Sequence, residues 1–135
     1  MKPNIPRPVI QEAVVEPAEI MPEPREPTNP WTDDEVQAIA QTLAGECYSD
    51  MEYDKRLVCE VILNRVSDER FADTIIDVLT TPYAFAGYWE QSRPVSDNDL
   101  EIAEQALRDW HANDCQPLSD IRFFNSGEGR QNHFY

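Results

Sequence analysis

The stretch "AIAQTLAGECYSD", residues 38–50, joins an apolar helical stripe to a carboxylate. Ile39, Leu43 and Glu46 fall at i, i+4 and i+7, so they share one face of an α-helix. The face that should be buried therefore ends in an ionisable acid. Burying a lone carboxylate costs free energy, and a raised pKa that keeps the group protonated reduces this cost. A protonated carboxyl in an apolar wall can serve as a general acid.

The helix that carries this stripe is expected over residues 33–45. Thr32 and Glu35 have the spacing of a capping box, in which the two side chains accept hydrogen bonds from each other's backbone N–H groups. Trp31 and Val36 occupy the positions of a hydrophobic staple at the same helix start. The predicted inward face consists of Val36, Ile39, Ala40 and Leu43.

Three more helices are expected, over residues 53–66, 73–80 and 96–112. The first has apolar residues around most of its circumference, which is typical of a helix in the middle of a domain. Pro82 ends the helix over residues 73–80, and Ser96 begins the helix over residues 96–112.

Two segments outside these helices are rich in aromatic residues. The segment "PYAFAGYW", residues 82–89, is expected to be a loop. The tail "IRFFNSGEGRQNHFY", residues 121–135, has the pattern of one or two short strands around a Gly-rich turn. The sequence therefore predicts a small, mainly α domain with one or two short strands.

The chain divides into a proline-rich arm and a folded domain. Residues 1–30 hold eight of the eleven prolines and can neither propagate a helix nor pair in the centre of a sheet. They are expected to form an extended, disordered arm or linker, which is either a plain tether to another component or a docking peptide. Residues 31–135 are long enough for one domain with a modest core.

The composition excludes several classes of partner and cofactor. A net charge of −15 argues against nucleic acid and against an anionic membrane surface. No apolar run is long enough for membrane insertion, and no apolar segment follows Lys2, so no signal peptide is visible. Cys47, Cys59 and Cys115 are odd in number and lack metal-ligand spacing, so neither a disulfide framework nor a metal site is expected, and a single bridge in an oxidising compartment is the alternative. We expect no cofactor, and we expect a monomer.

Glu46 is the leading candidate for catalysis. The alternative is that the helix ends at Gly45 and that Glu46 simply turns to solvent. Asp50, Glu52 and Asp54 follow closely, and like charges nearby would raise the pKa of Glu46 further. Pairs of carboxylates cleave glycosidic bonds, so Asp50 and Glu52 are candidates for a second carboxylate.

Exposed aromatic rings would suit a sugar ligand, because ring faces stack on the C–H faces of pyranoses. Tyr88 and Trp89, which follow Gly87, are the aromatic residues expected to be exposed. The alternative is that they belong to the core, as most aromatic side chains do. His111 and His133 each stand without the spacing of a metal site or a catalytic triad.

Several short motifs follow one another in order along the chain, and most of them lie in "AGECYSDMEYDKRLVCEVILNRVSDERFADTIIDVLTTPYAFA", residues 44–86. These motifs are Gly45-Glu46-Cys47, Leu63-Asn64-Arg65-Val66, Phe71 to Val78, Pro82 with Phe85, "RFFN" at 122–125 and "NHF" at 132–134. In the order and spacing of these motifs the chain resembles the SleB-type cell-wall hydrolases, the spore cortex-lytic family. The chain differs from the family at Ala84, where Gln is frequent, and at Glu60, where a small residue is usual.

The resemblance implies a lysozyme-like, mainly helical fold that cleaves peptidoglycan glycan strands in the bacterial cell wall. It implies that Glu46 is the catalytic acid. The residues that it places around the cleft are Asn64, Phe85, Phe124, Asn125 and His133. A phage lysin or a virion-associated lysin, active in bacteriolysis, would suit such a protein.

Two mechanisms use one buried glutamate in this way. In lytic transglycosylation, which the resemblance favours, Glu46 acts first as acid and then as base, and the product carries a 1,6-anhydro ring. In a hydrolytic muramidase, Asp50 or Glu52 would supply the second carboxylate. A non-catalytic module that binds glycan or serves a structural role is the rival class.

Overall fold

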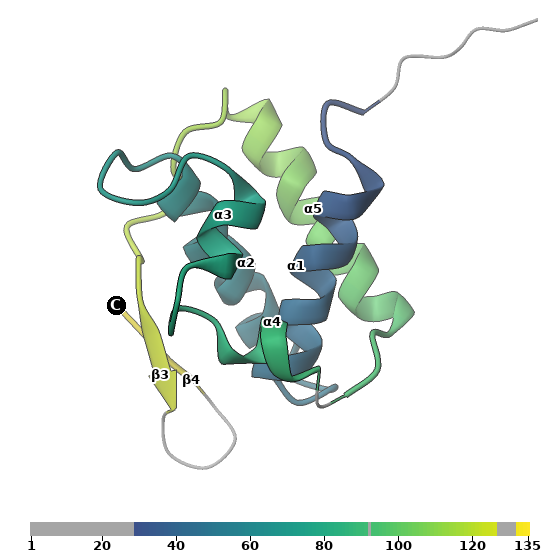
Figure 1. The fold of residues 1–135 in the computed structure, drawn as a ribbon. Coiled ribbons are helices and arrows are strands. Elements are labelled where there is room, and N and C mark those ends of the chain that lie inside the picture. Colours follow the sequence, from purple (N-terminus) through teal and green to yellow (C-terminus); the bar gives the residue numbers. More distant parts are fainter. Residues whose placement is uncertain (1–28, 92, 127–131) are drawn as a thin grey trace, which may run out of the picture. The chain divides into compact units, whose positions relative to one another are not determined.

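The computed structural model describes residues 29–91, 93–126 and 132–135, and this part of the chain is mainly helical, as predicted (Figure 1). All of the proline-rich arm except Asn29 and Pro30 lies outside the described residues, as does the Gly-rich turn near the C-terminus. Trp31–Tyr135 form one compact unit. Its elements are α1 (Asp33–Glu46), α2 (Glu52–Val66), α3 (Ile75–Thr80), α4 (Ala86–Glu90), α5 (Asp97–Ala112), β3 (Phe124–Ser126) and β4 (Asn132–Phe134).

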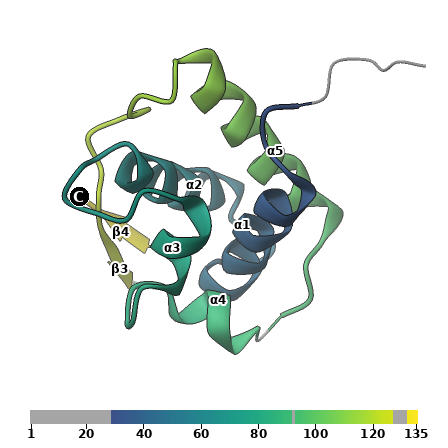
Figure 2. The same ribbon diagram turned by 45° about the horizontal axis from the view of Figure 1, so that its top comes forward.

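Helix α1 is the centre of the domain, because it packs against each of the other four helices. Figures 1 and 2 show it between α5 on one side and α2 with α3 on the other. The predicted capping box is present: Thr32 Oγ1 accepts a hydrogen bond from the Glu35 N–H, and the Glu35 carboxylate accepts one from the Thr32 N–H. The predicted inward residues Ile39, Ala40 and Leu43 are fully buried.

Helices α2 and α5 complete the core. The buried apolar face of α2 includes Val58, Val61 and Ile62, which confirms that this helix lies in the middle of the domain. Helix α5 begins with a second capping box, formed by Ser96 and Asp99, and packs against both α1 and α2.

The prediction of a loop is confirmed for residues 82–85 and was wrong for residues 86–89, because these belong to α4. Phe85 is fully buried just before the helix, and Gly87 is buried within it. A helix of five residues is too short to give a helical period in the sequence or to be stable alone, so packing against α1 determines it.

The C-terminal segment returns to the helical core as a two-stranded antiparallel hairpin. Phe124 lies opposite Phe134 in the register, and Asn125 lies opposite His133. The ring centroids of Phe124 and Phe85 are 5.9 Å apart, so the hairpin packs against the segment before α4.

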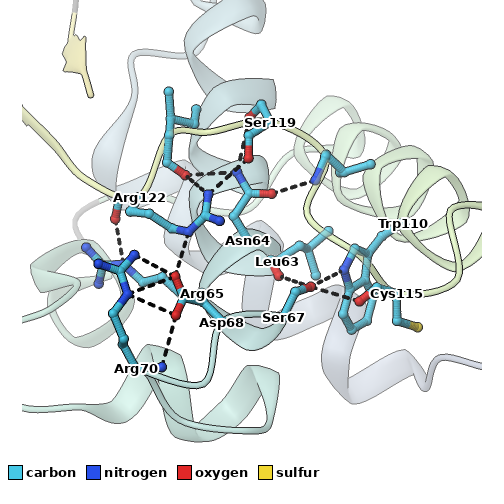
Figure 3. Close-up of polar contacts among 12 residues, drawn as sticks. Leu63, Asn64, Arg65, Ser67, Asp68, Arg70, Trp110, Cys115, Ser119 and Arg122 are labelled. Carbon is cyan, nitrogen blue, oxygen red and sulfur yellow. Dashed lines mark hydrogen bonds and ion pairs between the residues drawn. The ribbon is translucent and has the colours of Figure 1, made fainter.

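Asn64 connects α2 to the chain that leads into this hairpin (Figure 3). Its Nδ2 donates to Ser119 Oγ at 3.0 Å and to the Ile121 carbonyl at 2.8 Å, and its Oδ1 accepts from the Leu118 N–H at 2.7 Å. The side chain is fully buried. The amide therefore satisfies two backbone groups of residues 118–121 as well as a hydroxyl.

Replacing Asn64 by Ala should lower the free energy of unfolding by about 2–4 kcal/mol, because buried backbone groups would lose their partners. Urea denaturation of the two proteins measures this difference. Asn113→Ala is the control, since that exposed side chain makes only longer bonds, of 3.3 and 3.4 Å. Equal losses in the two variants would contradict this account of Asn64.

Candidate active site

Glu46 is the last residue of α1, and its side chain is half-buried. Its Oε2 accepts a hydrogen bond from the Gly87 N–H of α4 at 2.7 Å. The alternative, in which the helix ends at Gly45 and Glu46 turns to solvent, was wrong, since α1 includes Glu46 and α4 covers its carboxylate. The helix thus delivers one carboxyl to the contact between α1 and α4.

The environment of Glu46 raises the pKa of its carboxyl above the ordinary value. Burial is the largest cause, and the negative charge of Glu90 adds to it. The hydrogen bond from Gly87 and the positive charge of Arg93 act in the opposite direction and lower the pKa. The predicted direction and its main cause are confirmed. The like charge that raises this pKa is that of Glu90, whereas the sequence had suggested the acidic residues 50–54.

Two glycines allow α1 and α4 to touch backbone to backbone. A Cβ added to Gly45 would lie 2.3 Å from the Gly87 carbonyl oxygen. A Cβ added to Gly87 would lie 2.7 Å from the Gly45 carbonyl carbon and 2.8 Å from Glu46 Cγ. Any side chain at either position would therefore separate the two helices. This close approach brings the Gly87 N–H to the Glu46 carboxylate.

Arg93 holds the end of α1 from the connection between α4 and α5. Its Nε donates to the Ala44 carbonyl at 2.8 Å, and its Nη2 donates to the Cys47 carbonyl at 3.0 Å. The carbonyls at a helix C-terminus lack partners within the helix and favour a positive charge, and α1 has no basic residue in its own last turn. Arg93 supplies both the donors and the charge.

The hairpin meets the same helix end through Asn132. Its Nδ2 donates to the Glu46 carbonyl at 3.4 Å, and its N–H donates to Asp54 Oδ2 at 2.8 Å. Asp54 is buried in the first turn of α2. The first residue of β4 is thereby held between the end of α1 and the start of α2. Sequence reasoning gave no role to Asn132 or Arg93, and it treated Asp54 only as a neighbouring charge.

The predicted aromatic residues of the site fall into two groups. Tyr88 and Trp89 lie on α4, next to Gly87, with their rings nearly perpendicular and 5.3 Å apart. Trp89 is 58% exposed, whereas Tyr88 is half-buried. Phe85 and Phe124 pack against each other instead, and Phe85 has no exposed surface. The structure therefore offers the Trp89 ring, but not that of Phe85, to a ligand.

The polar residues expected around the cleft lie in three places. Asn125 and His133 are exposed, side by side in the hairpin. Asn64 is buried, and its amide is engaged by residues 118–121, so it does not face solvent. Asp50 is exposed between α1 and α2, and Glu52 is exposed at the start of α2, where it accepts a hydrogen bond from Asn98 Nδ2 at 3.2 Å.

A hollow of about 220 Å³ lies beside the candidate site, and Arg93 forms part of its wall. Burial raises the pKa of the Cys47 thiol in its wall to about 12, so this thiol is protonated at neutral pH and offers no nucleophile. The residues that line this hollow are Ala44, Cys47, Ser49, Arg93, Pro94, Ser96 and Asp99.

Neither a metal cluster nor a membrane span is found within the described ranges. No group of three or more His, Cys, Asp and Glu side chains there could hold a metal ion. The helices of the same ranges are all too short or too polar to cross a bilayer.

A half-buried carboxyl whose pKa is raised is chemically suited to acid–base work. The model of the cell wall hydrolase family matches residues 49–134, and the chain belongs to this family. The match begins just after Glu46. No curated protein matches the chain closely enough to count as a relative.

The fold is also that of a solved relative, the catalytic domain of the Bacillus cereus SleB protein. The two structures superpose with a TM-score of 0.58 at 21% sequence identity, over 76% of this chain and 77% of that chain. The resemblance to SleB-type enzymes that the motifs suggested is confirmed.

Replacing Gly87 by Ala should lower both stability and the rate of cell-wall clearing. The new Cβ would collide with Gly45 and Glu46, which should cost about 1–3 kcal/mol of unfolding free energy. The shift of α4 should also remove the N–H from the Glu46 carboxylate. Ala86→Ser, at the exposed neighbouring position, is the control for both measurements. A Gly87→Ala protein with unchanged stability and clearing rate would refute this role for the glycine pair.

Proposed function

We propose that this protein cleaves the glycan strands of peptidoglycan between N-acetylmuramic acid and N-acetylglucosamine by lytic transglycosylation. The observation that carries the proposal is the half-buried Glu46 carboxyl with its raised pKa. A carboxyl whose neutral form is favoured by burial is suited to donating a proton to a glycosidic oxygen. Membership of the cell wall hydrolase family supports the choice of substrate.

Glu46 would act twice in one turnover. In the first step its proton passes to the glycosidic oxygen as the bond to C1 of the muramic acid breaks. In the second step the Glu46 carboxylate takes the proton of the C6 hydroxyl, and the C6 oxygen forms the bond to C1 that closes the 1,6-anhydro ring. The Gly87 N–H and Arg93 favour the ionised form, so they would stabilise the carboxylate between the two steps.

A single acid–base residue fits the surroundings of Glu46. The charges that shift its pKa include those of Glu90 and Arg93. Glu52 is exposed and hydrogen-bonded to Asn98, at the start of α2. These observations favour a mechanism that needs no second carboxylate over one that uses Glu52.

A hydrolytic muramidase is the second candidate, and the observation that favours it is Glu90. Its carboxylate lies close enough to Glu46 to raise the pKa of that group. It could therefore serve as the second carboxylate of a hydrolase. In either reaction Trp89, which is exposed two residues after Gly87, would provide a ring on which a sugar can stack.

Glu46→Gln should reduce glycan cleavage by about 10²–10⁴-fold, because the amide cannot donate the proton. The folded state disfavours ionisation of Glu46, so above the unfolded pKa the ionised group opposes folding. The variant should therefore be at least as stable as the parent at neutral pH, as thermal unfolding would measure. Glu52→Gln is the matched control and should keep its activity. Full activity in Glu46→Gln would remove this residue from the chemistry.

Mass spectrometry of digested peptidoglycan distinguishes the candidate reactions. Anhydro-muramyl ends are the expected product of the transglycosylase, whereas reducing ends would indicate the muramidase. Binding to purified walls without any cleavage would favour the non-catalytic module.

Two substitutions near Glu46 should shift the pH profile of cleavage in opposite directions. Activity should fall as the pH rises through the pKa of Glu46, since the proton donor is then lost. Glu90→Gln removes a charge that raises this pKa, so the alkaline limb should move to lower pH. Arg93→Met removes a charge that lowers it, so the limb should move to higher pH.

Rates across the pH range, with thermal unfolding at each pH, test the two shifts. Glu101→Gln, at an exposed position of α5, is the control and should leave the limb in place. Shifts of the same sign in Glu90→Gln and Arg93→Met would contradict the proposed electrostatics.

A further inference from the structure

A second hollow, of about 200 Å³, lies where the end of α2 meets the 67–74 connection and α3. Its lining combines apolar side chains with two guanidinium groups. The residues that line it are Arg65, Arg70, Phe71, Ala72, Val78 and Thr81.

Arg65 is held rigidly at this hollow by aromatic rings. Its guanidinium carbon lies 5.0 Å from the ring centroid of Phe71 and 5.1 Å from those of Phe85 and Phe123. Its Nε donates to the Arg122 carbonyl at 2.7 Å (Figure 3). Burial lowers the pKa of Arg65, but a guanidinium keeps its charge in proteins. The fork is therefore charged and oriented before any ligand arrives.

Arg65 forms no ion pair with an Asp or Glu side chain in the described part of the chain, although an electrostatic contribution from Tyr135 raises its pKa. Its neighbours Arg70 and Arg122 share Asp68, at 2.6 and 3.0 Å (Figure 3). Within residues 29–91, 93–126 and 132–135, the guanidinium of Arg65 makes one hydrogen bond, which is donated by its Nε. This is notable in a chain with 26 acidic and 11 basic residues, where carboxylates are plentiful.

We propose that this hollow binds the free carboxylate of a short peptide with small aliphatic side chains. The two terminal nitrogens of Arg65 would donate to the two carboxylate oxygens, a geometry that suits a guanidinium. Ala72, Val78 and the Phe71 ring would contact a methyl-sized side chain. The identification of this carboxylate with the peptide stem of peptidoglycan rests on the proposed function, but the recognition of a carboxylate does not.

NMR titration of the full chain with N-acetyl-D-alanyl-D-alanine, and with its C-terminal amide, tests the site directly. We expect saturable shifts at the backbone amides of Ala72 and Val78, and a dissociation constant about tenfold or more weaker for the amide, because the charge-assisted bonds are lost. Absence of saturable shifts, or equal affinity for the two peptides, would overturn the proposal.

Two variants locate the binding. Arg65→Lys keeps the charge but removes the fork, and Ala72→Leu fills the hollow without changing Arg65. Both should weaken binding of the acid, whereas Arg108→Met, which removes an exposed guanidinium on α5, should not. Unchanged binding in folded Ala72→Leu protein would place the peptide elsewhere and overturn the proposal.

Cleavage rates on glycan strands with and without peptide stems distinguish this inference from the proposed function. Ala72→Leu should lower the ratio of the rate on stem-bearing strands to the rate on stem-free strands, and an unchanged ratio would refute the assignment to the stem. If the parent protein cleaves neither strand, the proposed function fails, and the peptide titration still decides whether the hollow binds a carboxylate.

Discussion

The contact between the backbones of Gly45 and Gly87 is the constraint on which the candidate site depends. It lets α4 cover the end of α1 so closely that a backbone N–H reaches the Glu46 carboxylate at 2.7 Å. The same contact removes the carboxyl partly from water, which raises its pKa, while the N–H moderates that effect. One packing detail thus supplies both the tendency to hold a proton and a donor that stabilises the charge once the proton has left.

The parts of the fold that hold this contact are polar as well as apolar. Arg93 binds the last carbonyls of α1 from beyond α4, and Asn132 ties the hairpin to the end of α1 and to the buried Asp54. Lys55, the residue of α2 that follows Asp54, is only 1% exposed and forms an ion pair with Asp99 at 2.8 Å. Buried groups of this kind are costly unless they are paired, so they favour one arrangement of the segments that meet at Glu46.

Local patterns in the sequence predicted the features that local physics determines. The capping box at Thr32, the buried stripe of α1 and the central place of α2 follow from residue spacing, and burial of the stripe led to the direction of the Glu46 pKa. The contacts of Gly87 with Glu46 and of Arg93 with Ala44 join residues 41 and 49 positions apart, and no local period encodes them. The hairpin was foreseen, but its attachment through Asn132 was not. The resemblance placed Asn64 near the cleft, whereas in the structure its side-chain amide is hydrogen-bonded to residues 118–121.

The central claim is that the folded protein holds the Glu46 carboxyl in its neutral form more readily than water does. Titration of the side-chain carboxyl by carbon-detected NMR, with its signal assigned by its loss in Glu46→Gln, measures this directly. The account predicts a midpoint above the ordinary value of 4.5. A midpoint at or below that value would contradict it, because burial under α4 would then not govern the ionisation of this group.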